Sequence, residues 1–377
     1  MEEQTMDRRD LFIAGALGAA VATPALIGVP AWASGEDRDN EPVRAHDRDR
    51  TLVVGHRGAS GYRPEHTLAS YELAARMGAD FIEPDLVSTL DGVLVARHEN
   101  EISGTTDVAA RPEFTTRRVT KTIDGVAVTG WFTEDFTLAE LKTLRAVERL
   151  PAVRQRNMVY NGLFEVPTFT EVLELRERLS KELRREIGVY PETKHPTYFQ
   201  DAGLPLERPL VAALRRFGLD RRDAPVFVQS FEAANLRELR SAHRLKAPLV
   251  FLAGAGSPFN DPRSYAEYLS PAGLRELAGV INGIGPEKGL VIPRAADGSL
   301  ATPTSLVADA HRQGLKVHPY TFRAENQFLP VNLRNGAVPA EYGRILDELA
   351  AYLAAGVDGF FTDNPDLGVL ARALHRA

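Results

Sequence analysis

Short apolar runs alternate with amphipathic stretches along most of this chain, and that alternation limits the folds that it can adopt. The runs have the length of buried strands, and the stretches have the apolar period of helices that pack on one face. Strands and helices that alternate in this way form a parallel sheet flanked by helices. Eight or nine strand candidates are present, which predicts the α/β class and a (β/α)8 TIM-type barrel rather than an open sheet. The strand candidates are residues 52–55, 81–86, 93–96, 187–190, 226–228, 249–252, either 280–281 or 290–292, 316–320 and 357–362.

The alternation is interrupted at two places after the second strand candidate. Residues 86–93 are too few for a helical crossover between parallel strands, so we expect an irregular part of the barrel there. Residues 99–166 are polar and break the rhythm of strands and helices. We therefore expect a barrel over residues 51–377, with a rim insertion after the third strand at about 99–166.

The first 33 residues have the pattern of an export signal. Arg8 and Arg9 precede an uncharged stretch over residues 11–35, and Ala31-Trp32-Ala33 fits a small-x-small cleavage site. The paired arginines indicate the twin-arginine route, so we expect an exported protein in the periplasm, the cell envelope or the medium. An uncleaved anchor is the alternative, and it would be the only expected contact with a membrane. Residues 34–50 are charged and lack an apolar period, which predicts a disordered leader.

Composition narrows the classes of function. The chain has 377 residues and a formal net charge of −6, so it has no generic attraction for nucleic acid, and we expect no nucleic-acid partner. It contains no cysteine, which excludes disulfides, thiolate metal ligands and a cysteine nucleophile.

Polar residues follow four of the strand candidates. Parallel-sheet enzymes carry their chemistry at the carboxyl ends of the strands, so a barrel would direct all four groups toward one centre. In chain order, the groups are His56-Arg57-Gly58 with Glu65 close behind, Glu83-Pro84-Asp85, His98, and Glu192-Thr193-Lys194.

The carboxylates in these groups predict a metal site. Glu83 and Asp85 are two residues apart, so their side chains lie on the same face of a strand. Together with Glu192 they suit a hard cation such as Ca²⁺ or Mg²⁺, and without a cation they would repel one another. Zinc would be expected to recruit histidine ligands. Arg57 beside His56 indicates an anionic substrate, with phosphate as the first candidate.

Each of these residues also has an ordinary structural explanation. Glu83 and Asp85 could be solvated residues at a strand end, and His98 could be a surface histidine. Glu192 and Lys194 could form a surface ion pair of little energetic value. The joint pattern is much less expected by chance than any one of its members.

Taken together, the motifs resemble those of the glycerophosphodiester phosphodiesterases. The resemblance extends from about residue 51 to residue 366, and the insertion after His98 is similar to that of the larger exported bacterial members. The motifs that carry it are His56-Arg57-Gly58, Glu65-His66-Thr67, Glu83-x-Asp85, His98, Glu192-x-Lys194, Gln229-Ser230-Phe231, Tyr320-Thr321-Phe322 and Thr362-Asp363-Asn364-Pro365.

The resemblance implies metal-dependent hydrolysis of glycerophosphodiesters to sn-glycerol 3-phosphate and an alcohol. His56 and His98 match the two catalytic histidines, which would act as general acid and base. The matching metal ligands are Glu83, Asp85 and Glu192, for one divalent cation that we expect to be Ca²⁺ rather than Mg²⁺.

The resemblance also implies the substrate contacts. Arg57 matches the arginine that contacts phosphate, and Lys194 matches a lysine that supports the phosphate or its developing charge. We expect Phe231, Tyr320 and Phe322 to wall the pocket beside the glycerol or the alcohol, with core packing as the alternative for each.

Two positions depart from the usual family pattern. The family usually has Asn where His66 stands, and Asp where Glu99 stands. These departures affect the surroundings of the site more than its catalytic groups, and they leave room for an unusual substrate.

Other functions are alternatives. One is a phospholipase-type or cyclising phosphodiesterase that acts on lipid or teichoic-acid-like diesters, so a cell-wall glycerol-phosphate polymer is a second possible partner beside the small-molecule substrate. A bacterial cyclising phospholipase C would share the paired histidines but would not need the carboxylates. The non-enzymatic alternative is an exported binding protein on a degenerate barrel, which would predict a broken set of motifs.

Overall fold

The structure of this chain is a computed structural model that describes residues 50–376, all of which belong to one compact unit. The expected export signal at residues 1–33 lies outside the described residues, as does the expected leader apart from Arg50. Within residues 50–376, no helix combines the length and the apolar character that crossing a membrane requires.

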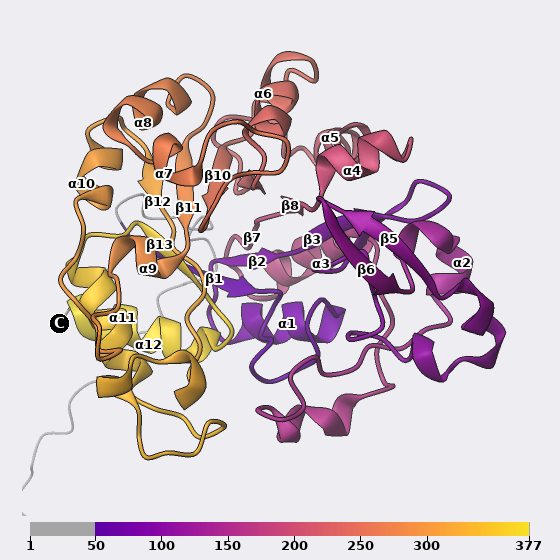
Figure 1. Cartoon of the computed structure of the whole chain (residues 1–377), viewed down its shortest axis with the longest axis horizontal. Coiled ribbons are helices and arrows are strands. Elements are labelled where there is room, and N and C mark those ends of the chain that lie inside the picture. The colour runs from indigo at the N-terminus through magenta and orange to yellow at the C-terminus, as the bar shows by residue number, and fades with distance from the viewer. Residues whose placement is uncertain (1–49, 377) are drawn as a thin grey trace, which may run out of the picture. The chain divides into compact units, whose positions relative to one another are not determined.

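Parallel strands surround a common interior, as Figure 1 shows. Two of the strands are interrupted: Pro84 separates β2 from β3, and Tyr190-Pro191 separates β7 from β8, because proline cannot donate a hydrogen bond to the ladder. When each interrupted strand is counted once, the described residues contain eight parallel strands, the number that a (β/α)8 barrel has. The strands are β1 (Leu52–His56), β2 (Phe81–Glu83) with β3 (Asp85–Ser88), β7 (Gly188–Val189) with β8 (Glu192–Thr193), β9 (Val228–Ser230), β10 (Leu249–Ala253), β11 (Gly283–Pro286), β12 (Lys316–Val317) and β13 (Gly359–Thr362).

The ladder of strands is not continuous around the barrel. One sheet has the order β13-β1-β2-β7, and the other has the order β12-β11-β10-β9-β8-β3-β4. Between β12 and β13 the link consists of isolated backbone hydrogen bonds, in which the amides of Asp358 and Phe361 donate to the carbonyls of Val317 and Pro319 at 2.9 and 3.0 Å. The TIM-type fold is confirmed, but a continuous ladder does not close it.

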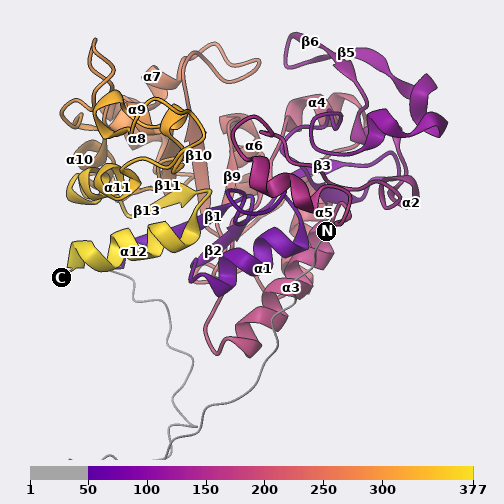
Figure 2. The same ribbon diagram turned by 90° about the horizontal axis from the view of Figure 1, so that it is seen from below.

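Helices follow the strands along the chain and lie outside them (Figure 2). Helix α3 begins with a capping box, in which Thr168 and Glu171 satisfy each other's backbone amides. Helix α1 begins with a simpler cap, in which the Thr67 hydroxyl accepts a hydrogen bond from the Ser70 amide. Helix α1 packs against α3, and α11 packs against α12. The helices are α1 (Leu68–Arg76), α2 (Leu138–Leu141), α3 (Phe169–Glu182), α4 (Pro196–Asp201), α5 (Glu207–Arg216), α6 (Ala233–Ser241), α7 (Tyr265–Tyr268), α8 (Pro271–Leu277), α9 (Lys288–Val291), α10 (Leu306–His311), α11 (Ile345–Ala354) and α12 (Pro365–Arg376).

A cluster of side chains from several strands fills the barrel interior. The Tyr190 ring meets the Phe361 ring edge-on at 4.9 Å, and the Tyr190 hydroxyl hydrogen-bonds Nδ1 of His318 at 2.9 Å. Inward-facing residues from alternate strands form such layers in barrels of this type. The buried members are Val54, Phe81, Tyr190, Val250 and Phe361.

The third strand candidate is not a barrel strand. Residues 94–96 form β4, which pairs with β3 in the antiparallel direction after a turn that contains Gly92 at φ +77°. Strand β3 therefore continues past Asp85, and β4 returns beside it until the Arg97 amide donates to the Asp85 carbonyl at 2.9 Å. The residues after β4 follow this return strand rather than a third strand of the barrel.

The position of the sixth parallel strand also differs from the expectation. Neither 280–281 nor 290–292 forms it, because β11 lies between them and contains Gly283 and Gly285. A Cβ at Gly283 would lie 2.9 Å from the backbone carbonyl oxygen of Lys316 on the neighbouring strand, so this crowded position favours glycine. Glycines carry no apolar signal, which explains why the pattern of apolar residues did not reveal the strand.

Residues between β4 and α3 contain an antiparallel hairpin of β5 (Val119–Ile123) and β6 (Val126–Gly130). The turn between these strands is Asp124-Gly125, with φ of +46° and +81°. Two consecutive positive φ values are typical of the tight turns that connect hairpin strands. The hairpin tip is thereby fixed at Asp124, a residue that contacts the site described below.

Candidate active site

The carboxyl ends of the strands enclose a cavity of about 450 Å³. This is the edge of the barrel where enzymes of this architecture bind their substrates. The cavity is lined by His56, Arg57, Glu83, Asp85, His98, Glu192, Gln229, Phe231, Leu252, Glu287, Lys288, Arg294, Tyr320, Thr321, Arg323, Gln327, Phe328 and Phe361.

Three buried carboxylates meet in this cavity. Oxygens of Glu83, Asp85 and Glu192 lie within 4.8 Å of one another. Burial raises the pKa of Glu83 well above its usual value, and burial raises the pKa of Glu192 to about 8. Three negative charges are therefore unstable at this spacing unless a cation accompanies them.

The hydrogen bonds of these carboxylates leave room for a metal ion. Glu83 accepts hydrogen bonds from the Arg57 amide at 2.7 Å and from Gln229 at 3.0 Å, whereas Oδ1 of Asp85 is buried without a hydrogen-bond partner. Lys194 Nζ lies 3.1 Å from Glu192. A buried oxygen without a partner beside two other carboxylates is the donor set that a hard divalent cation requires, so these residues could hold one.

His56 is fixed by the carboxylate at the end of the last strand. Its Nδ1 lies 2.5 Å from Oδ1 of Asp363, and its Nε2 faces the Thr321 hydroxyl at 3.4 Å. An Nδ1–H held by a carboxylate leaves Nε2 as the atom that can exchange a proton. Burial, followed by the charge of Arg57, lowers the pKa of His56 to about 4, so the ring is neutral at neutral pH.

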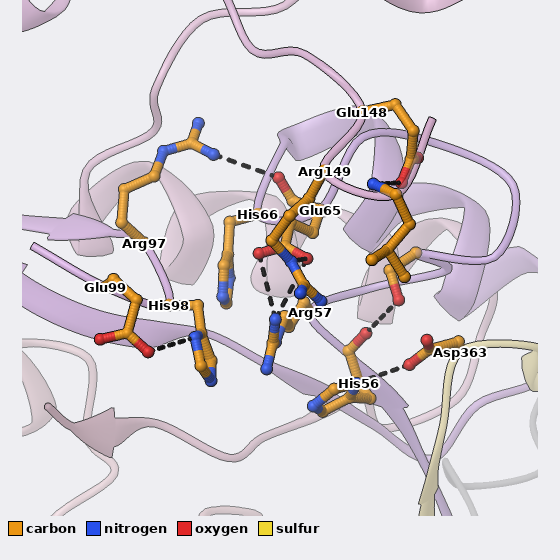
Figure 3. A network of polar contacts seen from close by, with 12 residues as sticks. His56, Arg57, Glu65, His66, Arg97, His98, Glu99, Glu148, Arg149 and Asp363 are labelled. Atoms are coloured by element: carbon orange, nitrogen blue, oxygen red, sulfur yellow. Dashed lines mark hydrogen bonds and ion pairs between the residues drawn. The ribbon is translucent and has the colours of Figure 1, made fainter. Parts of the chain in front are cut away.

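His98 is held in a similar way on the other side of the site, as Figure 3 shows. Its Nδ1 lies 2.7 Å from Oε1 of Glu99, and its side chain is 27% exposed. Burial, followed by the charges of Arg57 and Lys194, lowers the pKa of His98. The antiparallel return of β4 brings this histidine beside Asp85, and the cavity therefore contains two imidazoles whose Nδ1 atoms each face a carboxylate.

A model of the glycerophosphoryl diester phosphodiesterase family matches residues 56–367. The chain belongs to this family. The match begins at His56 and extends past the end of β13, so it includes every strand end that lines the cavity.

Proteins named as glycerophosphodiester phosphodiesterases are similar to this chain over most of its length. The glycerophosphodiester phosphodiesterase GDPD6 of Arabidopsis thaliana is 38% identical over 328 residues, which cover 83% of this chain and 84% of the relative. The glycerophosphodiester phosphodiesterase of Haemophilus influenzae is 28% identical over 344 residues, with 84% and 88% covered. This chain is accordingly an enzyme of the glycerophosphodiester phosphodiesterase class.

A solved structure shows the same fold. It is a phosphodiesterase from Oleispira antarctica in complex with the product sn-glycerol-3-phosphate, with a TM-score of 0.55 and 20% identity. The superposition covers 85% of this chain and 96% of that chain.

The two predicted phosphate contacts of the present chain, Arg57 and Lys194, have different surroundings. Arg57, at φ +59°, reaches both oxygens of Glu65 at 3.1 Å and lines the main cavity. Lys194 lines a neighbouring cavity of about 250 Å³, where its Nζ lies 5.6 Å from the centre of the Phe231 ring. The two cavities share Glu192 and Phe231, so Lys194 lies at the boundary between them.

The three predicted aromatic residues do not share one environment. Phe231 and Tyr320 line the cavity with their rings nearly perpendicular at 5.9 Å. Phe322 does not line it, and the expectation that Phe322 walls the pocket is wrong. Its side chain is fully buried against Tyr352 and Phe360, at ring distances of 4.8 and 5.7 Å. Residues 320–322 do not form a regular strand, and Tyr320 and Phe322 bridge to different neighbours, Glu287 and Thr362. The same-face rule for strand residues two apart therefore does not hold here, and Phe322 lies in the core.

His66 and Glu99, the two residues of this chain that depart from the family pattern, both contact residues of the site. His66 is buried at φ +53°, with Nε2 at 3.0 Å from Asp85 and Nδ1 at 2.7 Å from the Tyr71 hydroxyl. It therefore orients a carboxylate of the candidate metal site. Glu99 carries the contact to His98.

Sequence reasoning missed the residues that hold Asp363. Arg154 donates to Oδ2 of Asp363 at 2.5 Å and to Glu325 at 2.6 Å, and Arg323 donates to the same Asp363 oxygen at 2.8 Å. Although burial opposes ionisation, Arg323, Arg154 and His56 hold the pKa of Asp363 well below its usual range. The motif at the end of the last strand pointed to Asp363, but no pattern in residues 99–166 singled out Arg154.

Proposed function

We propose that this protein hydrolyses glycerophosphodiesters to sn-glycerol 3-phosphate and an alcohol, with a divalent cation at Glu83, Asp85 and Glu192. The observation that carries this proposal is the single cavity that contains these carboxylates, Arg57 and two imidazoles. The complex of the Oleispira antarctica phosphodiesterase with sn-glycerol-3-phosphate supports the same product.

The cation would supply positive charge to the non-bridging phosphate oxygens, and we propose Ca²⁺ in preference to Mg²⁺. Arg57 supplies a second, fixed positive charge from the end of β1, already oriented by Glu65. Preorganised charge of this kind costs no reorganisation when the phosphate charge develops.

His56 and His98 are the proposed acid–base pair. With Nδ1 of each ring held by a carboxylate, Nε2 is the atom that can take a proton from the attacking hydroxyl or give one to the leaving alkoxide. The glycerol 2-hydroxyl is the proposed nucleophile, and its attack would expel the alcohol and form a cyclic phosphate. Water then opens that ring to sn-glycerol 3-phosphate, with direct attack by water as the alternative.

The test is release of sn-glycerol 3-phosphate from glycerophosphocholine by the full chain, with Ca²⁺, with Mg²⁺ and with a chelator. Release that depends on the cation and disappears in His56→Ala supports the proposal. A wild-type rate that the chelator leaves unchanged would rule out the cation. Absence of release under all three conditions would redirect the search to lipid and polymer diesters.

Export by the twin-arginine route is also a proposal, and it rests on Arg8-Arg9 and on Ala31-Trp32-Ala33. The N-terminal sequence of the protein recovered from outside the cytoplasm tests it. A mature chain that begins at Ser34 is expected, and retention in the cytoplasm would contradict the proposal.

A further inference from the structure

Glu99 contacts two histidines at once. Its Oε1 lies 2.7 Å from Nδ1 of His98, and its Oε2 lies 2.8 Å from Nε2 of His195. Nδ1 of His195 in turn lies 2.5 Å from Oδ2 of Asp124. The four side chains therefore form a continuous series from the hairpin tip to the cavity, in the order Asp124, His195, Glu99, His98.

The backbone places His195 between these groups. It follows β8, the strand that carries Glu192, and it adopts φ +47° just before α4. Histidine is one of the non-glycine residues that adopt this left-handed conformation most readily. In this conformation the ring of His195 contacts Glu99 and Asp124.

The charges in this series are complementary. Although burial alone would lower it, the hydrogen bonds to Asp124 and Glu99 raise the pKa of His195 to about 9, and nearby Lys194 opposes this rise. Burial likewise opposes ionisation of Glu99, but its hydrogen bonds to His195 and His98 lower its pKa. At neutral pH the series consequently contains a cationic His195 between two carboxylates.

The surroundings restrain the Glu99 carboxylate less than they restrain the Asp363 carboxylate, so the contact with His195 matters for Glu99. The Asp363 side chain is fully buried between Arg154 and Arg323, whereas the Glu99 side chain is 47% exposed. A glutamate exposed to this degree has considerable rotamer freedom, and losing that freedom costs free energy. His195 is the cation that holds Glu99 in place, as the two arginines hold Asp363.

We propose that His195, anchored by Asp124 at the tip of the β5–β6 hairpin, is a positioning residue for His98. It fixes the Glu99 carboxylate, and Glu99 fixes the tautomer of His98 with the proton on Nδ1 and Nε2 directed to the cavity. Its effect on catalysis rests on the proposed function, whereas its effect on the tautomer of His98 does not. The hairpin between β4 and α3 thus becomes part of the catalytic apparatus, although it contributes no residue to the main cavity.

The experiment compares His195→Ala and His195→Gln with the wild-type full chain. The amide of glutamine can still donate to Glu99, so this variant is the conservative rescue. The matched control is His311→Ala, which removes another histidine from an ion pair, with Asp358 at 2.8 Å, on helix α10 outside the cavity.

Two readouts are combined. The tautomer of His98 is measured from long-range ¹H–¹⁵N spectra of histidine-labelled protein, and its signals are assigned with His98→Gln. We expect one tautomer in the wild type, a mixture in His195→Ala, and restoration in His195→Gln. In the turnover of glycerophosphocholine at saturating cation, kcat of His195→Ala should fall by about 10- to 100-fold with KM unchanged.

An unchanged His98 tautomer in His195→Ala would overturn the proposal, whatever the rate does. A rise in KM without a fall in kcat would overturn it as well. If His195→Ala fails to fold, Asp124→Asn is measured in the same way and is expected to produce a weaker mixture of tautomers. If the wild type cleaves no diester, the proposed function fails, and the tautomer measurement still decides this inference.

Discussion

Nδ1 of His56 lies 2.5 Å from Oδ1 of Asp363, which joins the end of the first strand of the barrel to the end of the last. Strands β1 and β13 pair in parallel from Leu52 with Gly359 to Gly55 with Thr362, so the next residues of both strands emerge side by side. The orientation of a candidate catalytic base therefore depends on the correct closure of the chain end against its beginning.

Asp363→Asn is expected to lower kcat by about 10- to 100-fold, because an amide can present its NH₂ group to the imidazole and favour the wrong tautomer. Asp366→Asn is the matched control, since Asp366 accepts a hydrogen bond from Tyr62 at 2.8 Å outside the cavity. Steady-state kinetics of both variants test whether kcat falls in Asp363→Asn alone. Equal rates for Asp363→Asn and the wild type would contradict this role of Asp363.

In the cation-free protein, the contribution of Glu192 to stability is expected to fall as the pH rises from about 4.5 to about 8. Burial raises the pKa of Glu192 from 4.5 to about 8, so the folded state binds more protons than the unfolded state between these values. Free energy of unfolding falls with pH wherever the folded state binds more protons. The stability contributed by the protonated carboxyl is present below pH 4.5 and is lost as the pH passes through 8.

Denaturant titrations at several pH values, with chelator and with Ca²⁺, test this expectation. A bound cation should remove most of the decline, because it stabilises the ionised carboxylates. Glu192→Gln should remove the decline without a cation. If the difference in free energy of unfolding between the cation-free wild type and Glu192→Gln does not fall between pH 5 and 8, the carboxylates do not interact as described.

Arg154→Ala should destabilise the fold as well as lower the rate. Removing the guanidinium would leave Asp363 and Glu325 as buried carboxylates without one of their cations. Breaking a buried pair from one side costs about 3–5 kcal/mol in free energy of unfolding. Arg156→Ala, at an exposed neighbouring position, is the control and should leave the free energy of unfolding nearly unchanged. Denaturant unfolding of the two variants provides the comparison, and equal losses in both would refute a specific role for Arg154.

Phe231→Ala should mainly affect substrate binding, whereas Phe322→Ala should mainly affect stability. Phe322 is packed in the core, so its truncation should cost about 3–5 kcal/mol in free energy of unfolding. Phe231 lines both cavities beside Lys194, so its truncation should mainly change KM. Thermal unfolding and steady-state kinetics on both variants separate the two environments. A larger loss of stability in Phe231→Ala than in Phe322→Ala would reverse the assignment.

The amino-acid sequence by itself determined the class of fold and the principal residues of the candidate site. Alternating strands and helices follow from local apolar periods, and residues at strand ends such as His56 and Glu83 reach one centre because parallel strands present their carboxyl ends together. These features depend on neighbours in the chain, so a linear pattern can encode them.

The tertiary structure alone decided the arrangement that supports these residues. The direction of β4 and the glycine-containing strand β11 depend on contacts with neighbouring strands, which no local apolar pattern reports. Arg154 reaches Asp363 across 209 residues of sequence, and Asp124 reaches His195 across 71. Such contacts are formed only when the hairpin and loops between β4 and α3 pack against the barrel. They could not be predicted from the sequence, because ion pairs carry no periodic signal along the chain.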